Sequence, residues 1–265
     1  MERMSAGERT NEPLLQVQDV VLRFGGVTAL DGVSFDVQAG ELFAVIGPNG
    51  AGKTSIFNCL NGVYRPQEGS ILLEGEQLVG KRPGETARLG IARTFQNLGL
   101  FVNLDVVDNL MLGRHTNMTT GFLAGMLYLG KARREEVRNR QRVEEIIDLL
   151  ELAPYRHTHV GVLPYGVQKR VELGRALAMD AKLLLLDEPV AGMNLEETED
   201  MARYILEIKD RLSLSMVLVE HDMHMVMDIA DRVMALDFGV PIATGTPDEV
   251  QSDPRVIEAY LGGAA

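Results

Sequence analysis

The chain has 265 residues, enough for one large domain or two small ones, and a chain of this size buries roughly 70–75% of its extended surface without a disulfide or structural metal. Its 46% hydrophobic and 24% charged residues are globular values that exclude a mainly disordered or fibrous chain. The 26 basic and 38 acidic residues give a net charge of −12, which argues against nucleic acid as a partner, because that partner requires clustered positive charge.

The N-terminus and the single cysteine bear on the compartment of the protein. Residues 1–12 are rich in charge and hold no apolar run, so we expect a flexible terminus rather than a secretory signal. No stretch reaches the ~18 apolar residues of a membrane span. Cys59 has no second cysteine to pair with, and we expect it to be a small buried residue. We therefore expect a soluble protein of a reducing compartment.

Two period-2 patterns near the N-terminus predict half-buried strands. The first places Val20, Leu22 and Phe24 on one face, and the second covers residues 33–37. A further short strand is expected at Ser70–Leu73. The N-terminal part is therefore predicted to form an antiparallel β layer.

Further along, short runs of consecutive apolar residues are typical of strands buried on both faces of a parallel sheet. These runs are Leu42–Ile46, Leu183–Leu186, Met216–Val219 and Val233–Leu236. Between about residues 97 and 180 the pattern is helical, and the apolar residues of 143–150 recur at i, i+3, i+4 and i+7. The expected fold class is α/β, with a parallel-sheet core, the antiparallel β layer and a helical subdomain.

Two helix starts are expected near the C-terminus. Thr246-Pro247 and Asp253-Pro254 each put a capping residue before a proline at the first helical position.

A glycine-rich segment after the first buried run matches the phosphate-binding pattern G-x-x-x-x-G-K-S/T. Its residues are Gly47, Pro48, Asn49, Gly50, Ala51, Gly52, Lys53 and Thr54. It lies between a predicted strand and a helix-compatible stretch, which is the context that the pattern requires. Backbone N–H groups of such a loop face a phosphate, Lys53 adds a charge for the β- and γ-phosphates, and the Thr54 hydroxyl is a Mg²⁺ ligand. The alternative is a chance glycine-rich turn.

Two acids end the apolar run Leu183–Leu186, at the edge of the sheet where open α/β folds bind ligands. Asp187 is expected to hold Mg²⁺ through a bound water, and Glu188 to polarise an attacking water as general base. Without the phosphate-binding loop upstream, the pair would be read as a solvated strand end.

The order of these motifs is similar to that of the ATP-binding subunit of an ABC transporter, from about residue 13 to Gly263. The resemblance implies a P-loop ABC ATPase domain over residues 13–250, with its helical subdomain at about 97–180. It implies a C-terminal helical extension over residues 251–265, and ATP and Mg²⁺ as the ligands.

The resemblance also implies roles for residues outside the P-loop. Phe24 matches the aromatic residue that stacks on adenine, Gln96 the glutamine that contacts Mg²⁺ and the attacking water, and His221 the histidine that contacts the γ-phosphate. Residues 163–168 match the signature motif. The nucleotide-binding residues added in this way are Ser55, Tyr165, Gly166 and Gln168. The alternatives are a core aromatic for Phe24, a surface amide for Gln96, and a metal site shared by His221 and His224.

Within the family, the chain resembles the ATPase subunits of importers for branched-chain and other hydrophobic amino acids. The resemblance is carried by Gly90–Asn97, an insertion at about 114–142, Asp187–Asn194 and Asp253–Gly262. It implies membrane permease subunits as partners, a solute-binding protein acting indirectly, and a place on the cytoplasmic face of a bacterial or archaeal membrane. The alternatives are an importer for urea or another small solute, and a soluble ABC ATPase without a transport role.

The signature segment departs from the usual L-S-G-G-Q of the family. Pro164 replaces the serine that binds the γ-phosphate, and Tyr165 and Val167 replace a glycine and a glutamine. In this family the γ-phosphate lies between the P-loop of one subunit and the signature of another. We therefore expect the second ATPase subunit to be a different chain.

The sequence allows two interpretations for each of two surface segments. The basic run 131–142 is a solvated helix face or a surface near anionic lipid headgroups. The apolar residues Leu98, Leu100, Phe101 and Leu104 belong to the core or line a groove for a helix of a membrane subunit.

Overall fold

The structure, a computed structural model, describes residues 12–94, 99–114 and 131–261, and the strands in these ranges form two sheets. The first is antiparallel, in the order β2-β1-β4-β5. Its strands are β1 (Leu15–Phe24), β2 (Val27–Val37), β4 (Glu68–Leu73) and β5 (Glu76–Gln77).

The second sheet has the order β10-β9-β3-β8-β7-β6, with only the edge strand β10 antiparallel to its neighbour. Its strands are β3 (Leu42–Ile46), β6 (Ile91–Arg93), β7 (Leu183–Asp187), β8 (Ser215–Val219), β9 (Arg232–Asp237) and β10 (Val240–Gly245). All four continuous apolar runs are strands of this sheet, so that prediction is confirmed. The sequence patterns did not predict β6 or β10.

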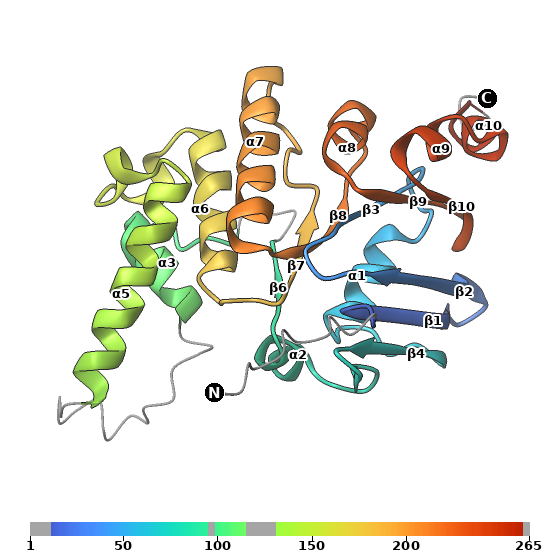
Figure 1. Ribbon diagram of the computed structural model, residues 1–265, viewed down its shortest axis with the longest axis horizontal. Coiled ribbons are helices and arrows are strands. Elements are labelled where there is room, and N and C mark those ends of the chain that lie inside the picture. Colours follow the sequence, from blue (N-terminus) through green and yellow to red (C-terminus); the bar gives the residue numbers. More distant parts are fainter. Residues whose placement is uncertain (1–11, 95–98, 115–130, 262–265) are drawn as a thin grey trace, which may run out of the picture.

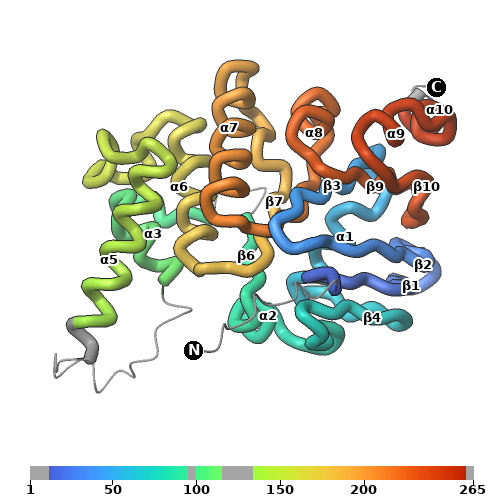
Figure 2. Tube along the Cα trace, viewed as in Figure 1, coloured from blue at the N-terminus to red at the C-terminus, as the bar shows by residue number. Residues whose placement is uncertain are grey.

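Helices lie on both sides of the mixed sheet (Figure 1). The helices are α1 (Lys53–Leu60), α2 (Pro83–Leu89), α3 (Val106–Arg114), α5 (Lys131–Leu149), α6 (Tyr165–Leu177), α7 (Leu195–Leu212), α8 (Met223–Ile229), α9 (Pro247–Gln251) and α10 (Pro254–Leu261). The predicted starts of α9 and α10 are confirmed. The trace in Figure 2 shows α3 and α5 gathered beside α6, at the end of the molecule away from β1 and β2.

The alternation of side chains along the central strands separates two hydrophobic cores. In β3, Leu42, Ala44 and Ile46 pack with α6, α7 and α8, whereas Phe43 and Val45 pack with the antiparallel sheet and α1. This division explains why a continuous apolar run was needed, because each face of the strand meets a different buried layer.

The pattern of β1 was predicted wrongly. Val20, Val21 and Leu22 are all buried, while Phe24 is 47% exposed. The cause is a register irregularity, since Asp19 has a left-handed backbone (φ 50) and the pairing with β2 shifts between Val17 and Leu22. In β2, the predicted alternation over residues 33–37 is confirmed.

A buried arginine links the helices of the helical part to one another. The Arg114 side chain donates to Asn139 Oδ1 (3.0 Å) on α5, to the carbonyl of Ala178 (2.7 Å) after α6, and to the carboxylate of Asp180. The predicted apolar stripe of 143–150 is buried, so this helix face is confirmed. The predicted domain boundary at residue 250 stays a prediction.

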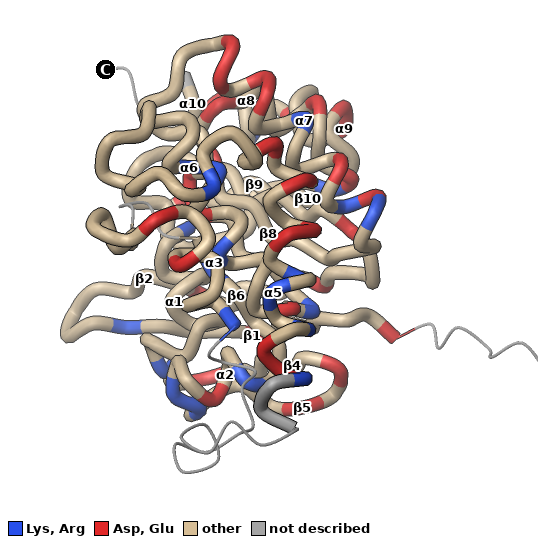
Figure 3. The backbone as a smooth tube through the Cα atoms, turned by 90° about the vertical axis from the view of Figure 1, so that its left-hand side faces the viewer, with Lys and Arg blue, Asp and Glu red and all other residues tan. Residues whose placement is uncertain are grey.

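Charges in the described residues are mixed rather than separated. In Figure 3, Asp and Glu gather over α7, α8 and α9, and Lys and Arg lie among them. On α5, Arg140 pairs with Glu136 (3.0 Å) and Arg142 with Glu145 (3.0 Å), which favours the solvated-face reading of residues 131–142. None of the helices in the described ranges is long and apolar enough to cross a membrane.

Candidate nucleotide site

Three adjacent strands bring the predicted site residues to one edge of the mixed sheet. The strand β3 ends at the P-loop, its neighbour β8 at Glu220 and His221, and the next strand, β7, at Asp187 and Glu188. Because these strands are parallel, their carboxyl ends meet at the same edge. Gln96 lies outside the described residues.

The P-loop is held by the strand beside it. A Cβ on Gly47 would overlap the carbonyl oxygen of Leu236 in β9, so only glycine fits there. The Lys53 ammonium donates to the carbonyls of Gly47 (2.6 Å) and Pro48 (3.0 Å). Burial lowers the pKa of Lys53, and the negative charges of Glu188 and Glu220 oppose that shift. The ammonium is therefore buried beside backbone carbonyls that a phosphate can replace.

A cavity of about 350 Å³ opens beside this loop, a volume within the range of small-molecule sites. Its lining is Val27, Thr28, Ala29, Asn49, Gly50, Ala51, Gly52, Lys53, Thr54, Ser55, Glu188 and Phe238. The structure therefore brings most of the predicted P-loop residues together with Glu188. Among the described residues, Phe24, Asp187 and His221 do not line it; Phe24 instead packs edge-on against Tyr64, with ring centroids 5.0 Å apart.

Asp187 is buried and already engaged. Its Oδ2 accepts from Arg93 Nη2 (2.6 Å), and its backbone N–H donates to Thr94 Oγ1 (3.2 Å). Arg93 also donates to Asn58 Oδ1 on α1 (2.8 Å). The arginine thus links β7 to the helix that follows the P-loop.

The donor set fits Mg²⁺, which prefers a few protein oxygens together with phosphate and water. Thr54 offers a hydroxyl at the cavity, and Asp187 offers a carboxylate with one oxygen directed to Arg93. In the described part of the chain, no group of three or more His, Cys, Asp or Glu side chains is arranged to hold a metal. The fit to Mg²⁺ therefore depends on oxygens from a bound nucleotide.

A carboxylate that the sequence analysis overlooked organises the strand end. Glu220 is fully buried, and its side chain accepts the backbone N–H groups of Val190 (3.1 Å) and His221 (2.8 Å). The His221 ring is 62% exposed, with Nδ1 3.4 Å from Glu220 Oε2. An acid at the end of the apolar run Met216–Val219 was the available signal. Glu220 therefore connects the segment after Glu188 to the histidine.

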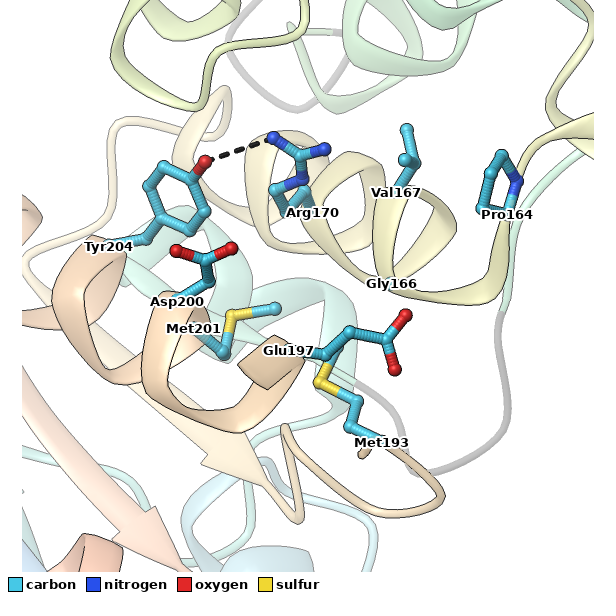
Figure 4. Close-up of a pocket in the computed structure, with 9 residues that line it drawn as sticks. All are labelled: Pro164, Gly166, Val167, Arg170, Met193, Glu197, Asp200, Met201 and Tyr204. Carbon is cyan, nitrogen blue, oxygen red and sulfur yellow. Dashed lines mark hydrogen bonds between the residues drawn. The ribbon is translucent and has the colours of Figure 1, made fainter. Parts of the chain in front are cut away.

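The signature segment lies at a different place. Tyr165 donates its hydroxyl to the carbonyl of Ala191 (3.0 Å), and Gln168 donates its side-chain amide to the carbonyl of Leu163 (2.8 Å). A Cβ on Gly166 would come 2.7 Å from Glu197 Oε1. Of the three, Gly166 lines a second, smaller pocket between α6 and α7 (Figure 4), together with Pro164, Val167, Arg170, Met193, Glu197, Asp200, Met201 and Tyr204. The structure does not bring Tyr165, Gly166 or Gln168 to the P-loop cavity.

Comparison with known proteins identifies the family. The family described as ABC transporter matches residues 30–191, and the one described as branched-chain amino acid ATP-binding cassette transporter matches residues 240–265. The high-affinity branched-chain amino acid transport ATP-binding protein BraF of Pseudomonas aeruginosa is 39% identical over 96% of this chain and 100% of its own length. LivG of Escherichia coli, described in the same words, is 38% identical over the same shares.

The fold agrees with these sequence relatives. An ATP-binding cassette of an ABC transporter, solved in its ADP conformation, superposes with a TM-score of 0.82 at 31% identity, covering 95% of this chain and 100% of that one. A nucleotide-free ATP-binding cassette gives a TM-score of 0.81 at 30% identity, covering 94% and 99%. The predicted fold class is therefore confirmed, and the chain belongs to the ABC transporter family of ATP-binding proteins, whose activity is that of an ATPase.

Proposed function

We propose that this chain is the ATP-hydrolysing subunit of an importer for branched-chain or other hydrophobic amino acids. One observation carries the proposal: relatives described as branched-chain amino acid transport ATP-binding proteins are 38–39% identical over their whole length. The cavity between the P-loop and Glu188 supports it, because it has the size and the lining of a nucleotide site.

In this proposal the P-loop residues Gly47–Thr54, with Ser55, bind the phosphates of ATP. Lys53 exchanges its bonds to the carbonyls of Gly47 and Pro48 for the β- and γ-phosphates. Thr54 and Asp187, together with Gln96, hold Mg²⁺, which when bound neutralises charge on the β- and γ-phosphates. Phe24 stays our prediction for a stacking contact with adenine.

Glu188 is the proposed general base. It lies at the cavity, and its backbone has a left-handed conformation (φ 48) that its N–H fixes by donating to the carbonyl of Val219 (2.9 Å). A carboxylate there accepts a proton from the water that attacks the γ-phosphate. His221 follows Glu220 on the neighbouring strand and is proposed to contact the same phosphate once ATP is bound.

The other half of the site is proposed to come from a second, different ATPase chain. Gly166 lines a pocket separate from this chain's own P-loop cavity, and Tyr165 and Gln168 do not line that cavity either, so we assign the three to a nucleotide held by the other chain. The N-terminus of the 13-residue helix α6 offers backbone donors and a partial positive charge for a phosphate.

Membrane permease subunits are the proposed partners of an apolar patch. Phe101, Val102 and Val162 are between 53% and 77% exposed, and the Gly161 N–H donates to the carbonyl of Val102 (3.0 Å), which holds their two segments together. Leu104 is half-buried, and Leu98 lies outside the described residues. A helix of a permease on this patch would place the chain on the cytoplasmic face of the membrane, with a solute-binding protein acting through the permease.

Reconstitution tests the transport role. The chain, its permeases and the solute-binding protein are assembled in liposomes, and ATP-dependent uptake of labelled leucine, isoleucine and urea is measured. We expect amino-acid uptake that is lost when Glu188 is changed to Gln. Uptake of urea alone would overturn the choice of solute, and hydrolysis indifferent to the permeases would overturn the transport role.

A titration of the purified chain tests the second subunit. MgATP turnover is measured against protein concentration, with and without the other ATPase chain. We expect feeble hydrolysis that the other chain restores. Brisk, cooperative hydrolysis by an ATP-dependent homodimer would contradict the proposal.

A further inference from the structure

The two-residue turn between β9 and β10 holds a phenylalanine in an unusual backbone conformation. Phe238 has φ 42 and Gly239 has φ 82, so both central residues of the hairpin are left-handed, as in a type I′ turn. Asn, Asp and Gly adopt this conformation readily, whereas a bulky side chain there is an outlier. The ring is also 84% exposed, so burial in this chain does not compensate for the strain.

Backbone hydrogen bonds fix this turn against the nucleotide site. The Gly239 N–H donates to the carbonyl of Ala51 in the P-loop (2.8 Å), and the Asp31 N–H donates to the carbonyl of Gly239 (2.9 Å). The Phe238 side chain consequently lines the cavity of about 350 Å³ together with the P-loop and with Val27 and Ala29 of β2. Strain and exposure therefore coincide at the rim of a ligand site, which is where strained residues point to function.

Phe24, the aromatic residue expected to stack on adenine, is not arranged as Phe238 is. Phe24 packs edge-on against Tyr64, with an interplanar angle of 74°, and within the described chain it is absent from the cavity lining. Phe238, which lies between two strands of the mixed sheet, supplies an aromatic ring to the P-loop cavity. Val27, at the start of β2, is a second exposed apolar side chain beside it.

We propose that Phe238 is a base-binding residue, whose ring packs against the base and ribose of bound ATP. The inference rests on the proposed function, that the cavity binds ATP. A bound base would cover the exposed ring, and this contact would offset the strained backbone. Because every base has a π-face, the contact raises nucleotide affinity without selecting adenine.

Equilibrium binding to three forms of the whole chain tests the proposal. Wild type is compared with Phe238→Asn, which removes the ring and suits the left-handed turn, and with Phe238→Tyr, which keeps the ring. The probes are ATP, GTP and inorganic tripolyphosphate, measured by calorimetry in EDTA. We expect Phe238→Asn to weaken ATP and GTP about fivefold to a hundredfold and to leave tripolyphosphate unchanged. Phe238→Tyr should bind all three probes as wild type does.

Each other outcome overturns the inference in its own way. Unchanged ATP affinity in Phe238→Asn would show that the ring does not contact the base. If hydrolysis were lost at the same time, the ring would be assigned to a contact with another subunit. An equal loss for ATP and tripolyphosphate would mean that the turn only supports the P-loop. A wild-type chain that binds no ATP would refute the proposed function instead. The urea midpoint of Phe238→Asn, expected at or above that of wild type, shows whether the variant is folded.

Discussion

The P-loop cavity and the signature pocket are built in contrasting ways. The P-loop is fixed mainly by backbone, with Gly47 against the carbonyl of Leu236 and Gly239 bonded to Ala51. The signature segment is fixed by side chains, with Tyr165 bonded to Ala191 and Glu197 close to Gly166. In the P-loop half the Lys53 ammonium is bonded only to backbone carbonyls that a phosphate can replace, whereas in the signature half the acidic side chain of Glu197 lies close to Gly166. We infer that the first half binds nucleotide in the single chain, and that the second half must rearrange before it acts.

The largest effect is expected on ATP hydrolysis in the P-loop half, where one substitution should reduce hydrolysis without reducing ATP binding. Glu188→Gln should slow MgATP hydrolysis by about 10² to 10⁴, because the amide cannot accept the proton of the attacking water. ATP binding should persist, and an ATP-bound dimer should accumulate. The rate of hydrolysis is measured on the chain together with its partner subunit. Gel filtration in the presence of ATP measures the dimer. The control is Glu199→Gln on the exposed face of α7, and near-normal turnover in Glu188→Gln would remove Glu188 from this role.

The next effect is on the free energy of unfolding, and it tests the buried ion pair between Arg93 and Asp187 in the P-loop half. Arg93→Met would leave the buried Asp187 carboxylate without its guanidinium, so unfolding free energy should fall by about 3 kcal/mol. Arg93→Lys should recover part of that loss. Urea denaturation measures it, and Arg140→Met is the matched control, since the exposed pair with Glu136 contributes about 0–1 kcal/mol. Equal, small losses in the two methionine variants would show that Arg93 does not brace this half.

A smaller effect is expected in the signature half. Gly166→Ala adds a Cβ 2.7 Å from Glu197 Oε1, which is closer than ordinary contact, and should lower turnover with the partner chain by about tenfold. The affinity of the single chain for ATP should not change. Gly84→Ala is the control, because a Cβ there meets no atom within 4 Å. A loss of ATP affinity in Gly166→Ala would mean that the two halves are not independent.

The smallest effect concerns the helix after the P-loop. Burial raises the pKa of Cys59 to about 12, so little thiolate forms at pH 8 and the native chain should react very slowly with Ellman's reagent. Addition of ATP should leave that rate unchanged, and urea should restore the rate of a free thiol. Fast labelling of the native chain would show that α1 opens and exposes Cys59.

Sequence patterns predicted what depends on neighbours along the chain. The runs such as Leu42–Ile46 specify strands because the side chains on both faces must be buried, and the phosphate-binding loop was recognisable from its spacing. The inward position predicted for Phe24 failed because the pairing of β1 with β2 shifts once more between Leu22 and Arg23, and local alternation carries no clear signature of such a shift. Arg93 was not identified because Asn58 and Asp187 lie far away in sequence, and the same holds for Glu220 and its partner Val190. Phe238 was missed for a related reason: its role depends on a turn between strands of which one, β10, was not predicted.

The contact between Gly47 and Leu236 affects how mutants of this protein are interpreted in living cells. A side chain at residue 47 would collide with the backbone of β9 in the core sheet, whether or not ATP is present. A strain carrying such a substitution would therefore lack the folded subunit, and its permease would lack a partner to assemble with. A substitution of Lys53 would instead leave a folded but inactive subunit that still occupies the permease. The first allele is expected to be recessive, and the second dominant when both copies are expressed together.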